Sequence, residues 1–171
     1  FPRFLNYSFL VSACSIFEYQ LKRICDVIKD EHKMPFGWDM DNSKVSTLVK
    51  IKRYLKLAAI PLADDPPRIE LRPPDFQPTE VFDESRVIIK VLWESLNDYF
   101  TIRNCIVHDN GVINEARNPA KVIKYATRKE IISYDHGQPE MSITPEYNIE
   151  VCNTMEKFFE KMMSAYYSTP L

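Results

Sequence analysis

A chain of 171 residues, 45% hydrophobic and 27% charged, can bury a sizeable core in one domain, which excludes a disordered chain. Its formal net charge of −2 excludes a global attraction to nucleic acid, so any such binding must rest on local basic patches. No apolar stretch approaches the roughly 20 residues that span a bilayer, so we expect no membrane partner and a cytoplasmic protein. The chain begins at Phe1 with neither a methionine nor a signal-peptide pattern, so we expect the natural N-terminus to lie upstream.

The four cysteines, Cys14, Cys25, Cys105 and Cys152, form no CxxC pair and all fall in apolar helical segments. Such cysteines are typical of reduced, buried thiols in a cytosolic protein rather than of a disulfide framework. A metal site that joins His108-Asp109 to Asp135-His136 is disfavoured, because a hairpin tip commonly carries both residue types. We therefore expect no metal and no other cofactor.

The first predicted element is a long amphipathic helix over 4–33, since apolar residues recur there every three or four positions. Met34-Pro35-Phe36-Gly37 ends it, and Ser43 is a candidate N-cap for a second helix that continues to about residue 59. A proline-rich linker follows over 61–78, because no helix survives so many missing N–H donors.

A third helix is predicted from about residue 79 or 83 to His108, with Asn110-Gly111 as its stop signal. A short helix over 119–127, a small hairpin of 131–134 with 141–143, and a last helix over 145–167 complete the chain. These elements predict an all-α fold: a compact bundle of about four to five helices with a proline-rich linker and one short β-hairpin. Residues 1–171 are expected to form a single helical domain.

The third helix carries an unexpected charge. On a helical wheel with Leu92 at zero, Arg103 falls at about 20°, in the middle of the apolar stripe, while Asn104 and His108 lie at its edge, at about 120° and 160°. A guanidinium buried without a partner costs several kcal/mol or more, so Arg103 must pair with an acid or line a cleft. In the simpler interpretation Arg103 forms a structural ion pair, with Glu18 as candidate partner, and His108 is a helix-end cation.

The run from Arg103 to His108, late in a long helix and followed by Asp109-Asn110-Gly111, resembles the motif of the HEPN superfamily. The first helix is similar too, because Glu18 followed by Lys22 looks like the acidic-then-basic motif of many members; the same spacing is also an ordinary i,i+4 pair. The resemblance implies a metal-independent RNA endonuclease that acts as a homodimer, with Arg103, Asn104 and His108 as catalytic residues. Some HEPN relatives are inactive.

Two segments, 44–56 and 117–129, are basic with no acid between their charges. The RNA-guiding residues are expected there: Lys50, Lys52 and Arg53 in the first segment, Lys121 and Lys124 in the second. Arg117 begins the second segment. In the alternative interpretation, both segments are solvent-exposed faces whose positive charge balances the negative charge of the acidic residues in the linker.

We thus expect a HEPN-like ribonuclease with RNA as its substrate, in a toxin–antitoxin or defence setting, with an antitoxin or a nucleotidyltransferase as a candidate partner. The chemistry would be attack of the ribose 2′-OH on its own phosphate, with a histidine moving the proton and a guanidinium binding the phosphate. The alternative is a non-catalytic HEPN-like module that binds nucleic acid, a nucleotide or a protein.

Overall fold

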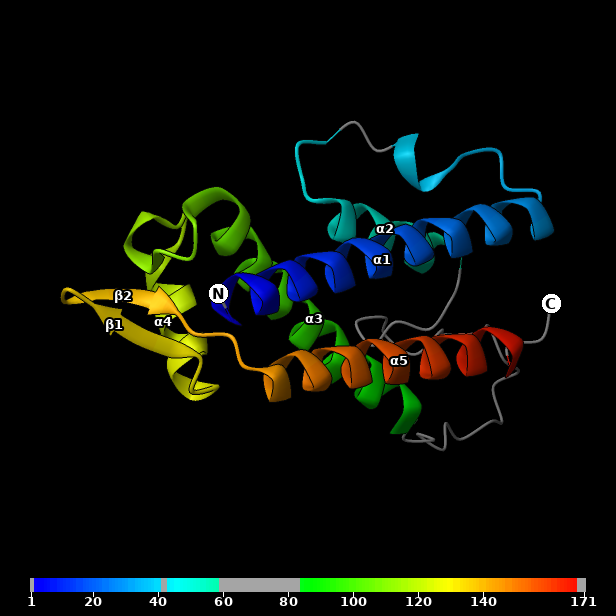
Figure 1. The fold of residues 1–171 in the computed structure, drawn as a ribbon. Coiled ribbons are helices and arrows are strands. Elements are labelled where there is room, and N and C mark those ends of the chain that lie inside the picture. The colour runs from blue at the N-terminus through cyan, green and yellow to red at the C-terminus, as the bar shows by residue number, and fades with distance from the viewer. Residues whose placement is uncertain (1, 41–42, 59–83, 169–171) are drawn as a thin grey trace, which may run out of the picture.

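Three long helices form the body of the molecule: α1 (Pro2–Glu31), α3 (Glu84–Asp109) and α5 (Pro145–Ser168). The computed structural model describes residues 2–40, 43–58 and 84–168. Figure 1 shows α1 and α5 side by side and running in the same direction, with α3 packed behind them. Each helix forms because its apolar residues recur at helical spacing, and these faces meet in a shared core around Phe17, Tyr99 and Phe158.

The shorter helix α2 (Thr47–Leu57) covers the C-terminal half of α1, after the single turn η1 (Trp38–Met40). The hydroxyl of Tyr54 lies 3.3 Å from the sulfur of Met34, and its ring meets that of Phe36 edge to face. The predicted cap at Ser43 is wrong, since α2 begins four residues later and Ser43 instead accepts a hydrogen bond from the Arg53 guanidinium. The proline-rich linker lies outside the described residues.

A smaller unit follows α3: the turn η2 (Ile113–Glu115), helix α4 (Pro119–Arg128) and a hairpin of β1 (Ile132–Asp135) and β2 (Gln138–Met141). The strands pair antiparallel, with Ile132 opposite Met141 and Asp135 opposite Gln138. Figure 1 places this unit at the end of the bundle near the N-terminus of α1. It therefore packs where α3 ends.

The fold class is confirmed: the described chain is an all-α bundle with one short two-stranded hairpin. The hairpin differs from the prediction in its second strand, which covers 138–141 rather than 141–143, so only His136 and Gly137 separate the two strands. His136 and Gly137 both have positive φ, 47° and 79°, which is what a tight two-residue turn between twisted strands requires. Within 2–40, 43–58 and 84–168, no helix combines the length and the apolarity needed to cross a membrane.

Candidate functional site

The last turns of α3 present Asn104 and His108 on the exposed side of the helix, one turn apart. The helix ends where Asn110 and Gly111 adopt positive φ values of 52° and 81°. The chain then turns back, because the Gly111 N–H donates to the Cys105 carbonyl at 3.1 Å and the Gly111 carbonyl accepts from the Met141 N–H at 2.9 Å. The predicted stop signal at Asn110-Gly111 is therefore confirmed, and it fixes the end of the helix beside β2.

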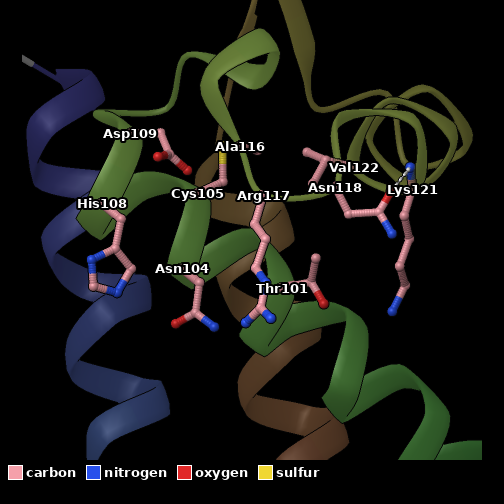
Figure 2. A pocket seen from close by; sticks show the side chains of 10 residues that line it. All are labelled: Thr101, Asn104, Cys105, His108, Asp109, Ala116, Arg117, Asn118, Lys121 and Val122. Atoms are coloured by element: carbon pink, nitrogen blue, oxygen red, sulfur yellow. Dashed lines mark hydrogen bonds between the residues drawn. The ribbon is translucent and has the colours of Figure 1, made fainter. Parts of the chain in front are cut away.

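Asn104 and His108 line a pocket of about 630 Å³ between α3 and the smaller unit. Figure 2 shows it from close by: α3 supplies one wall, and the turn after η2 together with the start of α4 supplies the other. The second wall carries two cations, Arg117 and Lys121, and the N-cap residue Asn118. The pocket is thus polar and basic on one side, with a histidine and an amide on the other. Its ten lining residues are Thr101, Asn104, Cys105, His108, Asp109, Ala116, Arg117, Asn118, Lys121 and Val122.

Arg103 does not line this pocket but contacts a residue that does. The half-buried Arg103 donates from Nη1 to the Asn104 Oδ1 at 2.9 Å. Because a guanidinium has only donors, the Asn104 oxygen must face Arg103, which leaves the Asn104 Nδ2 group free to donate elsewhere. In Figure 2 this amide nitrogen points toward the Arg117 side of the pocket. Arg103 therefore orients the amide that the pocket presents.

The charge of Arg103 also acts on Cys14, a buried residue of α1. Burial raises the pKa of the Cys14 thiol to about 12, and the nearby positive charge of Arg103 opposes this rise. Glu18 also acts on the Cys14 thiol, raising its pKa, so Arg103 and Glu18 lie around the same buried group.

Two predictions about Arg103 are wrong in detail. Arg103 is not in the middle of the buried stripe, because the buried face of α3 shifts in its last turns to Ile102 and Cys105, at about −80° and −140° on the same wheel. The shift follows from η2 and α4, which pack on that side, and it leaves Val107 42% exposed. Nor does Glu18 pair with Arg103: its carboxylate lies 2.6 Å from the Lys22 ammonium, and no carboxylate of the described residues lies within ion-pair distance of Arg103.

Only one of the predicted RNA-guiding residues reaches the pocket. Lys121 lines it and also approaches the Asp98 carboxylate at 3.4 Å, whereas Lys124 is exposed on α4 outside the pocket. The other predicted residues, Lys50, Lys52 and Arg53, lie on α2, which packs against the C-terminal half of α1. They do not line the pocket at the end of α3.

Arg117, Asn118 and Thr101 were missed as individual site residues. Arg117 lies in the basic segment that the sequence indicated, but its position opposite Asn104 depends on the turn between η2 and α4, which the sequence does not specify. Asn118 precedes Pro119, and its side chain caps α4 by accepting from the Lys121 N–H at 3.3 Å. That cap signal was readable from the sequence.

The described side chains include no group of three or more His, Cys, Asp or Glu that could hold a metal ion. Asp135 and His136 contact each other at 2.7 Å on the exposed hairpin. The chain matches no protein-family model, no curated protein and no solved structure.

Proposed function

We propose that this protein is a metal-independent RNA endonuclease of the HEPN type. The observation that carries the proposal is one pocket lined by His108, Asn104, Arg117 and Lys121, with Arg103 hydrogen-bonded to Asn104. An imidazole supplies proton transfer, and amide and cationic donors supply phosphate binding. These are the groups that cleavage of RNA requires when no metal takes part.

In the proposed reaction the ribose 2′-oxygen bonds to the adjacent phosphorus while the bond to the 5′-oxygen breaks. His108 takes the proton of the 2′-OH, and the departing 5′-oxygen gains a proton, so the products are a 2′,3′-cyclic phosphate and a free 5′-OH. The Asn104 amide donates to the phosphate oxygens as negative charge grows on them. Arg103 holds that amide in place through its hydrogen bond and keeps a positive charge nearby.

A single histidine does not readily serve as base and acid in the same step. We propose that a second copy of the chain supplies the acid, so that two pockets form one cleft in a homodimer. A cytoplasmic protein of this kind would suit a toxin–antitoxin or defence system, in which an antitoxin or a nucleotidyltransferase restrains the nuclease.

The experiment incubates the purified protein with single-stranded RNA in the presence of a chelator and compares the wild type with His108→Ala. The matched control is His136→Ala, because that histidine is 91% exposed on the hairpin, away from the pocket. We expect cleavage by the wild type and by His136→Ala, loss of at least about 100-fold with His108→Ala, and a cyclic phosphate in the product mass. Equal cleavage by all three proteins would contradict the proposal. RNA binding without cleavage would favour the non-catalytic module.

A further inference from the structure

We propose that Arg117 and Lys121 form a binding subsite for a second phosphate of the RNA backbone, next to the phosphate that is cleaved. The inference rests on the proposed function for the position of the scissile phosphate. It adds a substrate requirement: the RNA must carry a charged linkage beside the scissile one.

The first support is the position of Arg117 on a well-anchored turn. The preceding residue, Ala116, is buried and donates its N–H to the Ile113 carbonyl at 3.1 Å, and the following residue, Asn118, caps α4. Figure 2 shows the Arg117 side chain reaching from this turn toward α3, between Asn104 and Thr101. Its backbone is thus fixed on both sides while its guanidinium stays exposed at the pocket.

The second support is the local excess of positive charge. Lys121 and Arg128 share one carboxylate, that of Asp98, at 3.4 Å and 3.5 Å. No carboxylate of the described residues lies within ion-pair distance of Arg117. Among the described residues that line the pocket, Asp109 on the α3 wall is the one acid, so the Arg117 wall retains positive charge although the whole chain carries −2. A bound anion would supply the missing negative charge.

The third support is chemical fit. A guanidinium offers paired N–H donors that match the oxygens of a phosphate, and a lysine adds a point charge. The pocket, at about 630 Å³, is in the range of small-molecule sites, so it has room for more than one phosphate group. Because Asn104 and His108 occupy the α3 wall, a scissile phosphate bound there leaves the Arg117 wall to the neighbouring linkage.

The first test measures binding without turnover. His108→Ala serves as the background, and its affinity for a labelled single-stranded RNA is measured by fluorescence anisotropy over a range of salt concentrations. We expect Arg117→Ala and Lys121→Ala each to weaken binding and to reduce the slope of log K against log salt by about 0.7, the value for one phosphate contact on a single strand. The matched controls are Arg23→Ala on α1 and Lys90→Ala on α3, both exposed and outside the pocket. A change with Arg117→Ala no greater than with Arg23→Ala overturns the inference.

The second test uses the active enzyme and short RNAs in which one linkage beside the scissile bond is an uncharged methylphosphonate. We expect the neutral linkage at one flank to raise the KM of the wild type and to have little further effect on Arg117→Ala, whose KM is already raised. Equal sensitivity of both proteins overturns the inference while leaving the nuclease proposal intact. If the wild type cleaves no RNA, the nuclease proposal fails, and the salt slopes alone decide whether Arg117 and Lys121 bind phosphate.

Discussion

The phenolic oxygen of Tyr7, in α1, lies against Gly111, in the turn after α3: a β-carbon added to Gly111 would be only 2.5 Å from it. The same hydroxyl donates to the Met141 carbonyl in β2 at 2.6 Å and accepts from the Arg3 Nε at 3.0 Å. One buried side chain therefore joins the first helix, the turn that follows His108 and the hairpin. The position of the pocket depends on this junction, because the turn sets where α3 ends and where η2 begins.

Replacing Gly111 with alanine should destabilise the fold by about 2–4 kcal/mol, because the left-handed backbone and the contact with Tyr7 both oppose a side chain. The measurement is urea unfolding followed by circular dichroism. Gly137→Ala is the matched control: Gly137 has nearly the same φ, 79° against 81°, but nothing lies within 4 Å of the β-carbon it would gain. It should cost only the backbone contribution, about 1–2 kcal/mol. If both variants lose the same free energy of unfolding, the contact between the new methyl group and Tyr7 does not contribute to the destabilisation.

The contact itself is tested by a double-mutant cycle with Tyr7→Phe. The phenylalanine loses the hydrogen bond to the Met141 carbonyl, at a cost of about 1 kcal/mol, and removes the closest atom to the new methyl group. Gly111→Ala should then cost less in the Tyr7→Phe background than in the wild type, by at least 0.5 kcal/mol on the scale of coupled neighbours. Strict additivity would contradict this account of the junction.

The helices were predictable because their signals are local. A buried stripe such as Leu10, Cys14, Phe17 and Leu21 repeats every three or four residues, and it forms one face of α1 whatever packs against it. The hairpin turn was harder, because His136 had to be recognised as a residue that adopts positive φ beside Gly137. A short alternation of residues does not by itself fix the register of two strands.

The site was predictable on α3 and not beyond it. Asn104 and His108 share a wall because residues four apart in a helix are neighbours. Arg117 reaches the same pocket through a turn, and its place depends on how η2 and α4 pack against α3. That packing also turned the buried face of α3 toward Ile102 and Cys105, which a wheel of constant angle could not show. Tertiary packing therefore decided both the position of Arg117 and the direction of the buried face of α3.

Buried tyrosines should make the protein lose stability in alkali. Burial raises the pKa of Tyr99 from 10.0 to about 12, and the pKa values of Tyr125 and Tyr147 are raised as well, chiefly by burial. A raised pKa favours the protonated phenol in the folded state, so the stabilisation is complete below pH 10 and is lost as the pH rises toward about 12. Unfolding in urea at pH 9, 10 and 11 should show the decline.

Tyr99→Phe removes one of these phenols, so its stability should fall less steeply than that of the wild type above pH 10, by up to about 1.4 kcal/mol per pH unit. The comparison isolates the Tyr99 phenol, because every other side chain is the same in the two proteins. The variant also loses hydrogen bonds to Glu150 and Thr154, so it should start from a lower stability at pH 9. Parallel curves for the two proteins would contradict the role given to Tyr99.

The cysteines should react in the order of their exposure. Burial raises the pKa of Cys14 and Cys25 to about 12 and that of Cys105 to about 11, so the reactive thiolate is scarce at pH 8. Cys152 is half-buried, and we expect iodoacetamide to modify it first in the native protein and all four at similar rates in urea. Mass spectrometry of the modified peptides gives the order. Native modification of Cys14 as fast as Cys152 would contradict the burial described here.

The hydrogen bond from Arg103 to Asn104 predicts a specific defect in catalysis. Asn104→Asp keeps the shape and still accepts from Arg103, but it replaces the Nδ2 donor with a second oxygen that repels a phosphate. We expect kcat/KM for RNA cleavage to fall by about 100-fold, the usual cost of losing one donor to a developing oxyanion. Arg103→Lys keeps the positive charge, but the shorter side chain should not reach the Asn104 oxygen. The factor by which kcat falls should therefore exceed the factor by which KM rises. Asn114→Asp, at an exposed position outside the pocket, should leave both constants unchanged. Wild-type activity in Asn104→Asp would mean that the amide nitrogen does not contact the reacting phosphate and that Arg103 and Asn104 serve the fold alone.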